Sequence, residues 1–347
     1  MIPKKSSLNL GVLGPYLALA AMIVIAAATS DHFFQVRNLL NITRQVSYTG
    51  IIALGMTFVI IAGGIDLSVG SAVAFIGGMI ITSMNYFFLE FGPGSQAISI
   101  ILALAIGLAI GFVGGLLSGF FITKFNIAPF ITTLGFMGIY RSLALYTGNG
   151  GEFRVEGGIK YFMQFGGGWF LGLPIPSFIF ILLAVLFTII LKWTRFGRYV
   201  CAVGSNERVA AYAAVRVGYV RTLTYVICGV TVAISAFMLG GRMNSINSTN
   251  AGTLYELDSI AAVVIGGTAM TGGSGSMAGT VAGALMLGII SNMLNMWGVS
   301  AYLQGTVKGL VIIFAVLVQR PEAQQMVKDA FHLVVRALRG KLASEDE

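Results

Sequence analysis

Long apolar stretches alternate with short polar connections along almost the whole chain, a pattern typical of helices that cross a membrane repeatedly. Most stretches approach the roughly 20 residues that an α-helix needs to span a bilayer. The pattern therefore predicts an all-α membrane protein with about ten transmembrane helices. The predicted spans cover residues 12–29, 48–63, 70–88, 97–123, 128–146, 174–192, 219–240, 257–268, 277–297 and 301–319.

Two of the predicted spans end in glycine-rich breaks. The first break reads Gly63-Gly64-Ile65-Asp66-Leu67-Ser68-Val69-Gly70, and the second starts at Gly266-Gly267 and includes residues 272–275. A carboxylate on broken backbone is costly in a bilayer unless protein or a water-filled cavity surrounds it. Paired interruptions in two halves of a chain are typical of transporters built as a pseudo-repeat. We predict a two-half pseudo-repeat whose gate includes Gly64, Asp66, Ser68, Gly266 and Gly267.

Two further segments are predicted between the spans on the outer side. Residues 31–46 have the composition of a short amphipathic segment that lies at the membrane interface. Residues 147–173 are rich in glycine and are predicted to form a loop, with Trp169 near its end.

Composition supports the membrane assignment. The chain has 347 residues, of which 56% are hydrophobic and 10% are charged, whereas a soluble domain carries about 25% charged residues. The 46 glycines are expected mainly to let helices approach closely.

The distribution of charge predicts an orientation. The net charge is +8, but basic residues gather beside spans, in the stretch 192–221 and in the tail 320–347, as the positive-inside bias requires. This placement argues against a nucleic-acid partner. It predicts a multi-pass membrane protein, in contact with lipid, with both termini and the tail in the cytoplasm.

Catalytic and metal-binding patterns do not occur in the sequence. The two cysteines and two histidines form no ligand cluster, so no metal site is expected. The single Gly-Lys pair, Gly340-Lys341, is followed by Leu342 and not by the Ser or Thr of a phosphate-binding loop. We therefore expect no catalytic residues, no enzyme activity and no bound cofactor, with any ATP bound by a partner subunit.

The basic segment 194–217 has the features of a docking element. Ser205 or Asn206 is placed to cap a short helix, with Glu207 in its first turn facing the helix dipole. A short helix on the cytoplasmic surface suits docking into a groove of another protein. A solvated basic loop that only sets the topology is the alternative.

At this point the sequence resembles the permease subunits of bacterial ribose-type ABC importers, the branch that takes up monosaccharides such as ribose, xylose and galactose. The resemblance extends from Phe33 to Val318. The motifs that carry it are Asn38-Leu39-Leu40-Asn41-Ile42, the stretch from Gly55-Met56-Thr57 to Gly70-Ser71, Thr194-Arg195-Phe196-Gly197-Arg198, Gly204-Ser205-Asn206-Glu207 and the stretch from Tyr255-Glu256-Leu257-Asp258 to Gly266-Gly267-Thr268.

The resemblance implies one permease domain over 1–347, which moves sugar through a pathway formed with a second permease copy, identical or related. It also implies a cytoplasmic ATP-binding subunit that drives transport and a periplasmic sugar-binding protein that delivers the substrate. The helix after the sixth span is similar to the family's coupling helix, which assigns ATPase coupling to Gly204, Asn206, Glu207, Ala210 and Ala211. Relatives usually have a glycine where this chain has Ala213-Ala214, so the end of this helix is expected to differ.

Other polar residues in the spans have two interpretations. Asp66 is expected to cap the following helix through Ser68, and direct contact with sugar is the alternative. Arg141 is expected to pair with a carboxylate or to extend to the outer interface. Hydroxyl and amide groups in spans either bond neighbouring helices or line a sugar path with aromatic side chains. The candidates for the path are Phe130, Thr132, Thr133, Asn292 and Asn295.

Two alternative functions remain open. One keeps the ABC architecture and changes the cargo to a nucleoside or a signalling furanose. The other is a secondary transporter, which needs an ionisable site inside the membrane. Only Asp66 and Arg141 are charged residues at a plausible depth in the membrane. Two such residues leave few groups that could couple transport to an ion gradient.

Overall fold

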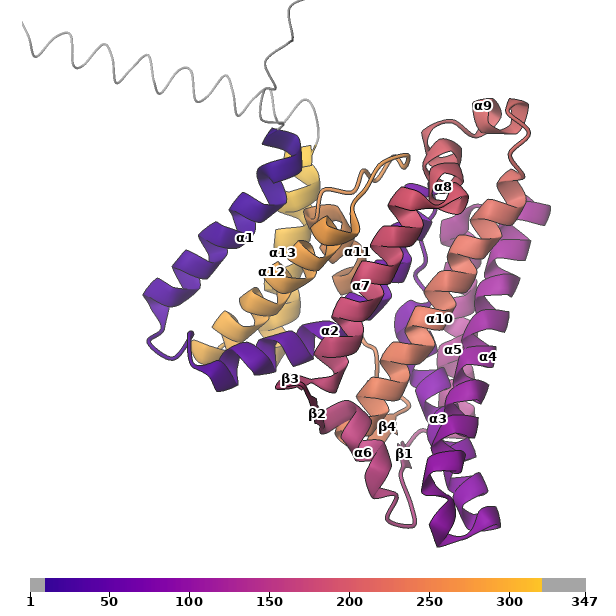
Figure 1. Ribbon diagram of the computed structural model, residues 1–347, viewed down its shortest axis with the longest axis vertical. Coiled ribbons are helices and arrows are strands. Elements are labelled where there is room, and N and C mark those ends of the chain that lie inside the picture. The colour runs from indigo at the N-terminus through magenta and orange to yellow at the C-terminus, as the bar shows by residue number, and fades with distance from the viewer. Residues whose placement is uncertain (1–9, 320–347) are drawn as a thin grey trace, which may run out of the picture. The chain divides into compact units, whose positions relative to one another are not determined.

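The computed structural model describes residues 10–319 and divides the chain into two units, 1–299 and 300–347. The second unit contributes α13 (Ala301–Gln319). The first unit contains the other helices (Figure 1). They are α1 (Leu10–Thr29), α2 (Val36–Ile61), α3 (Val69–Phe91), the 3₁₀ turn η1 (Pro93–Ser95), α4 (Gln96–Lys124), α5 (Pro129–Thr147), α6 (Lys160–Gly167), α7 (Ile175–Trp193), α8 (Arg195–Ser205), α9 (Glu207–Tyr212), α10 (Val217–Met243), α11 (Tyr255–Ile265) and α12 (Met277–Met296).

The helices confirm an all-α membrane protein. Within the described residues, six helical segments are long and apolar enough to cross a bilayer, and Gly14–Thr29 and Leu303–Phe314 are shorter apolar helices. Every predicted span coincides with a helix, but the count of ten crossings stays a prediction. The predictions for the cytoplasmic N-terminus and the tail 320–347 lie outside the described residues. The single domain over 1–347 also stays a prediction.

The predicted interface segment at 31–46 is wrong in its extent. Residues 36–61 form one continuous helix, α2, and its second half is buried on all sides. No glycine or proline occurs between Val36 and Thr49, so nothing stops the helix where the polar part meets the apolar part. The polar residues mark one end of a span and not a separate element.

The predicted loop at 147–173 is partly ordered into short elements. It contains α6 and three short strands, of which β1 pairs with a strand far along the chain. The strands are β1 (Glu152–Arg154), paired antiparallel with β4 (Ser245–Asn247), and β2 (Trp169–Phe170), paired antiparallel with β3 (Leu173–Pro174). Ser245 and Arg154 both donate to the Glu152 carboxylate, at 2.9 and 3.0 Å, and these bonds lower the pKa of Glu152.

The two ends of the first unit carry different elements. Helix α7 starts directly after β3 and leads into α8 at its other end, so the strands and α8–α9 lie at opposite ends of the bundle (Figure 1). A helix of 19 residues covers roughly 28 Å at 1.5 Å per residue. The separation matches the hydrocarbon thickness of a bilayer, about 30 Å.

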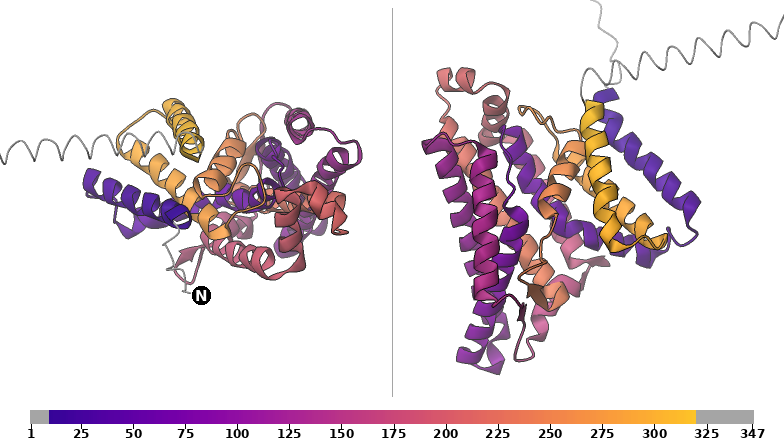
Figure 2. Two further views of the ribbon diagram at one scale, coloured as in Figure 1. Left: turned by 90° about the horizontal axis from the view of Figure 1, so that it is seen from above. Right: turned by 180° about the vertical axis from the view of Figure 1, so that it is seen from behind.

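A row of glycines on α4 lets this helix pack closely against α10. Figure 1 and the right-hand view of Figure 2 show α4 and α10 side by side, and this is the most extensive helix contact in the unit. Gly107, Gly111, Gly115 and Gly119 follow at intervals of four residues and so share one face. A Cβ at Gly115 would lie 2.7 Å from the Cα of Val226. The backbones therefore touch, as in other small-residue membrane interfaces.

Replacement of Gly115 by leucine is expected to lower the stability of the protein. The added side chain meets the backbone of α10, which cannot move aside, and overpacking of this kind costs about 1–3 kcal/mol. Thermal unfolding in detergent measures the effect, with Gly138→Ala as the control because a Cβ at Gly138 has nothing within 4 Å. Equal melting temperatures for Gly115→Leu and the wild type would contradict the packing role.

Candidate functional site

The first glycine break connects α2 to α3 through residues 62–68. Gly63 has a φ of 80°, which favours glycine because side chains are strained there. The Asp66 side chain accepts hydrogen bonds from the backbone N–H and the hydroxyl of Ser68, at 2.9 and 2.6 Å, and both residues are buried. The predicted hydrogen bonds between Asp66 and Ser68 are present, but Asp66 is not the N-cap residue of α3: that position is Ser68, whose side chain makes no capping bond.

A narrow cleft runs from Asp66 into the bundle. Its walls include Gly115 and Ser118 from α4, Tyr140 from α5 and Gly229 from α10. Its volume is about 10 Å³, which is space for about one water molecule. Asp66 therefore has no room for a sugar beside it in this structure.

The second glycine break, residues 266–276, connects α11 to α12. Gly267, Gly272 and Gly273 have φ values of 86°, 84° and 83°. Gly266 touches the backbone of Gly279 on α12, so that α11 and α12 cross without intervening side chains. Helix, glycine break and helix thus follow one another in both halves, as the predicted pseudo-repeat requires.

The two breaks meet each other and the end of α8. The Gly273 N–H donates to the Ile61 carbonyl oxygen at 2.8 Å, which satisfies a carbonyl at the C-terminus of α2. A Cβ at Gly204 would collide with the same oxygen and would lie 2.6 Å from the Gly273 nitrogen. We call Ile61, Gly204, Gly272 and Gly273 the glycine junction. Three segments far apart in the sequence are in backbone contact there.

The residues predicted for ATPase coupling divide into two groups. Asn206 caps α9 by accepting from the Val209 N–H at 3.1 Å, and Glu207 forms an ion pair with Arg221 of α10 at 3.0 Å. Ala210 is buried and Gly204 touches backbone in the junction, so these four residues build and anchor the helix. Ala211 is exposed.

The outer face of α9 is formed by residues that the sequence did not single out. Val209 and Tyr212 are 61% and 91% exposed, beside Ala211. The helix ends at Tyr212, and Ala214 has a φ of 58°. The N–H groups of Ala214 and Val215 donate to the carbonyls of Ala211 and Ala210, which is the Schellman arrangement with alanine in place of glycine. The expected difference at this helix end is thus confined to one strained residue.

Residues predicted for the sugar path on α5 do not converge with those on α12. Phe130 is exposed, Thr133 donates to the Pro129 carbonyl at 2.9 Å, and the buried Thr132 hydroxyl has no hydrogen-bond partner among the described residues. Asn292 instead exchanges two amide hydrogen bonds with Asn38 of α2, at 2.8 and 3.2 Å. This supports the helix-bonding interpretation for Asn292.

Asn295 and Arg141 also lie apart from the Asp66 cleft. Asn295 is exposed near the end of α12. Arg141 donates to the carbonyl oxygens of Ser248, Thr249 and Ala251 at 2.8–3.1 Å. The predicted carboxylate partner is therefore wrong as a direct contact, because the loop before α11 supplies three carbonyls. Arg141 fixes that loop to α5.

Two residues of the site were missed in the sequence. Tyr225 of α10 donates its hydroxyl to the Ile65 carbonyl at 3.2 Å and so supports the first break. Tyr140 lines the Asp66 cleft. A tyrosine inside an apolar span is a signal for such roles, since a buried hydroxyl needs a partner, but the sequence does not say which partner.

Sequence comparisons show which known proteins this chain resembles. A family profile described as "Branched-chain amino acid transport system / permease component" matches residues 38–316. A ribose import permease protein of Bacillus subtilis is 41% identical over 315 residues, which cover 90% of this chain and 93% of the relative. No solved structure matches the chain significantly.

Two relatives from Escherichia coli strain K12 show a similar degree of likeness. Its ribose import permease protein is 37% identical over 304 residues, covering 87% of this chain and 91% of the relative. Its galactose/methyl galactoside import permease protein is 37% identical over 312 residues, covering 87% and 92%. The likeness therefore runs across nearly the full length of each protein.

Removal of the Asp66 carboxylate is expected to destabilise the first break. Asp66→Ala leaves the Ser68 N–H and hydroxyl without their acceptor, which costs about 1–3 kcal/mol for a buried group. Asp66→Asn keeps one side-chain oxygen and is the matched control. Membrane abundance and thermal stability should fall in the order wild type, Asn, Ala. An alanine variant as stable as the wild type would show that the hydrogen bonds at Ser68 are dispensable.

Proposed function

The chain belongs to the family of branched-chain amino acid transport system permease components, and from this premise we propose that it is the membrane-spanning subunit of an ATP-driven monosaccharide importer. The observation that carries the proposal is sequence similarity, at 37–41% identity over nearly the full length, to permeases named for the import of ribose and galactose. The buried cleft that contains Asp66, Ser68, Ser118 and Tyr140 supports it, because a passing sugar needs polar groups inside the bilayer. Ribose is the first candidate, since it occurs in the name of the relative with 41% identity.

The proposed importer assigns a partner to each end of the first unit. A cytoplasmic ATP-binding subunit docks on α8–α9, where Val209, Ala211 and Tyr212 form the exposed face. That subunit binds and hydrolyses the ATP. A periplasmic sugar-binding protein delivers substrate at the opposite end, and a second permease copy completes the pathway. In this arrangement the chain lies in the bacterial inner membrane with both termini in the cytoplasm.

The glycine junction provides a mechanism for coupling. The end of α8 packs at Gly204 against the Ile61–Gly273 hydrogen bond with no side chain between the backbones, so a movement of α8 toward this bond must displace Ile61, Gly273 or both. Four residues separate Ile61 from Asp66, and Gly273 leads to α12. Docking at α9 can therefore displace both breaks together and open the Asp66 cleft.

Uptake by reconstituted vesicles tests the proposed function. The permease, the ATP-binding subunit and the sugar-binding protein are placed together in proteoliposomes, and accumulation of radiolabelled ribose, galactose and arabinose is measured with and without ATP. We expect ATP-dependent uptake of one of these sugars. Uptake by the permease alone, with no partner and no nucleotide, would refute the proposal.

Gly204→Ala is expected to separate ATP hydrolysis from transport. The methyl group would meet the Ile61 carbonyl oxygen and displace α8, and the loss of about 1.4 kcal/mol of coupling free energy corresponds to a roughly tenfold fall in uptake per ATP hydrolysed. Gly218→Ala is the matched control, because its Cβ would lie 3.6 Å from Thr123, an ordinary contact. Equal transport ratios for the two variants would show that the junction does not carry the coupling.

A further inference from the structure

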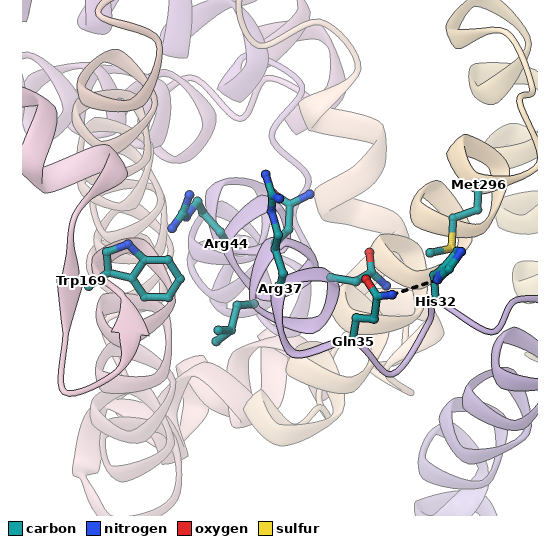
Figure 3. Close-up of a pocket in the computed structure, with 9 residues that line it drawn as sticks. His32, Gln35, Arg37, Arg44, Trp169 and Met296 are labelled. Atoms are coloured by element: carbon teal, nitrogen blue, oxygen red, sulfur yellow. Dashed lines mark hydrogen bonds between the residues drawn. The ribbon is translucent and has the colours of Figure 1, made fainter.

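A large polar cavity of the first unit lies far from the glycine junction, at the end of the bundle that carries the strands. Figure 3 shows it between the start of α2, the strand β2 and the end of α12. Its volume is about 430 Å³, within the range of small-ligand sites. Arg37, Asn41 and Arg44 follow one another on one face of α2 and line it.

The positive charges of Arg37 and Arg44 in this cavity have no acidic partner among the described residues that line it. None of the described residues that line it is acidic. Across residues 10–319, the ion pairs involve Arg154 and Arg221, and neither Arg37 nor Arg44 has a carboxylate partner. Two guanidinium groups on one face of α2, without a counter-charge, favour an anionic ligand. The N–H donors of a guanidinium group match the oxygen atoms of a phosphate group.

Arg44 is held in place with a donor still free. Its guanidinium lies over the Trp169 ring at 4.9 Å from the ring centre, and its Nε is buried without a hydrogen-bond partner among the described residues. Buried donors are normally paired. Gln35 lies on the other side of the cavity, with its Nε2 2.8 Å from the Nδ1 of His32. The cavity thus presents cationic and neutral polar groups that are already positioned.

The surroundings of the cavity indicate the level of the membrane interface. Two of the three tryptophans in the chain flank it, Trp169 in its wall and Trp297 next to Met296, and they are 55% and 52% exposed. Tryptophan is enriched at this level of a bilayer. Phe34 and Leu171 are apolar and highly exposed on the neighbouring turns. A ligand with a charged head and apolar chains fits both parts of this surface.

We propose that the cavity binds the phosphate headgroup of an anionic phospholipid. Arg37 and Arg44 donate to the phosphate oxygens, the Arg44 Nε gains its missing acceptor, and the acyl chains extend along the exposed apolar side chains. The site ties the α2 terminus, the β2–β3 hairpin and the end of α12 to the lipid surface. This inference depends only on the membrane location of the chain and not on the transported solute.

Lipid binding to the full-length chain tests the proposal. Native mass spectrometry of delipidated protein in detergent measures the affinities for phosphatidylglycerol and for phosphatidylcholine with the same acyl chains. We expect the wild type to bind phosphatidylglycerol about tenfold more tightly than phosphatidylcholine, because both lipids offer a phosphodiester to the arginines but the cationic choline group of phosphatidylcholine is repelled by them. Arg37→Gln/Arg44→Gln should lose this preference, and the control Arg154→Gln, an exposed arginine at the same end, should keep it.

Further outcomes separate this site from other anion sites. Glycerol 3-phosphate that binds as tightly as the lipid would overturn the proposal in favour of a free phosphate ester. A double variant that keeps its lipid preference but loses affinity for the sugar-binding protein would overturn it in favour of an acidic protein partner. If the double variant does not accumulate, Arg37→Gln and Arg44→Gln are measured singly, and an unchanged lipid preference in both would also overturn it.

Discussion

One backbone hydrogen bond joins the two glycine breaks, and this part of the first unit is organised around it. The carbonyl of Ile61 at the end of α2 receives this bond from Gly273, in the break between α11 and α12. In the first break, the Ser68 N–H donates to Asp66 and the Ile65 carbonyl accepts from Tyr225 of α10. Each interruption is therefore stabilised by another segment, and a change in one break costs hydrogen bonds that the other break or α10 supplies.

Glycine makes this mutual support possible because it lets three backbones come into contact. Larger residues at positions 204, 272 or 273 would separate α8 from the breaks, and side-chain rotation could then absorb a movement of α8. With the backbones touching, no side chain can absorb a movement between the end of α8 and the two breaks. The Asp66 cleft lies one short segment away, between α3, α4, α5 and α10. In the proposed mechanism, an event at the exposed face of α9 reaches the Asp66 cleft through these contacts.

Local patterns in the sequence were sufficient to predict the helices but not the contacts that form the site. Apolar length predicted each span, and the Asn206 cap and the Asp66–Ser68 hydrogen bonds followed from chemistry within a few residues. The amphipathic composition of residues 31–46 suggested a separate interface segment, whereas α2 runs without a break from Val36 to Ile61. The contacts of Gly204 with Ile61 and Gly273, and the Asn38–Asn292 pair, join distant parts of the chain and leave no local pattern.

Hydrogen–deuterium exchange in the assembled transporter tests the mechanical unity of the two breaks most directly. Exchange is followed in peptides covering residues 60–68 and 266–276, first without nucleotide and then with a non-hydrolysable ATP analogue on the partner subunit. Protection of both segments should change together and to a similar extent, because they share the Ile61–Gly273 hydrogen bond. A nucleotide response in one segment with none in the other would contradict the account.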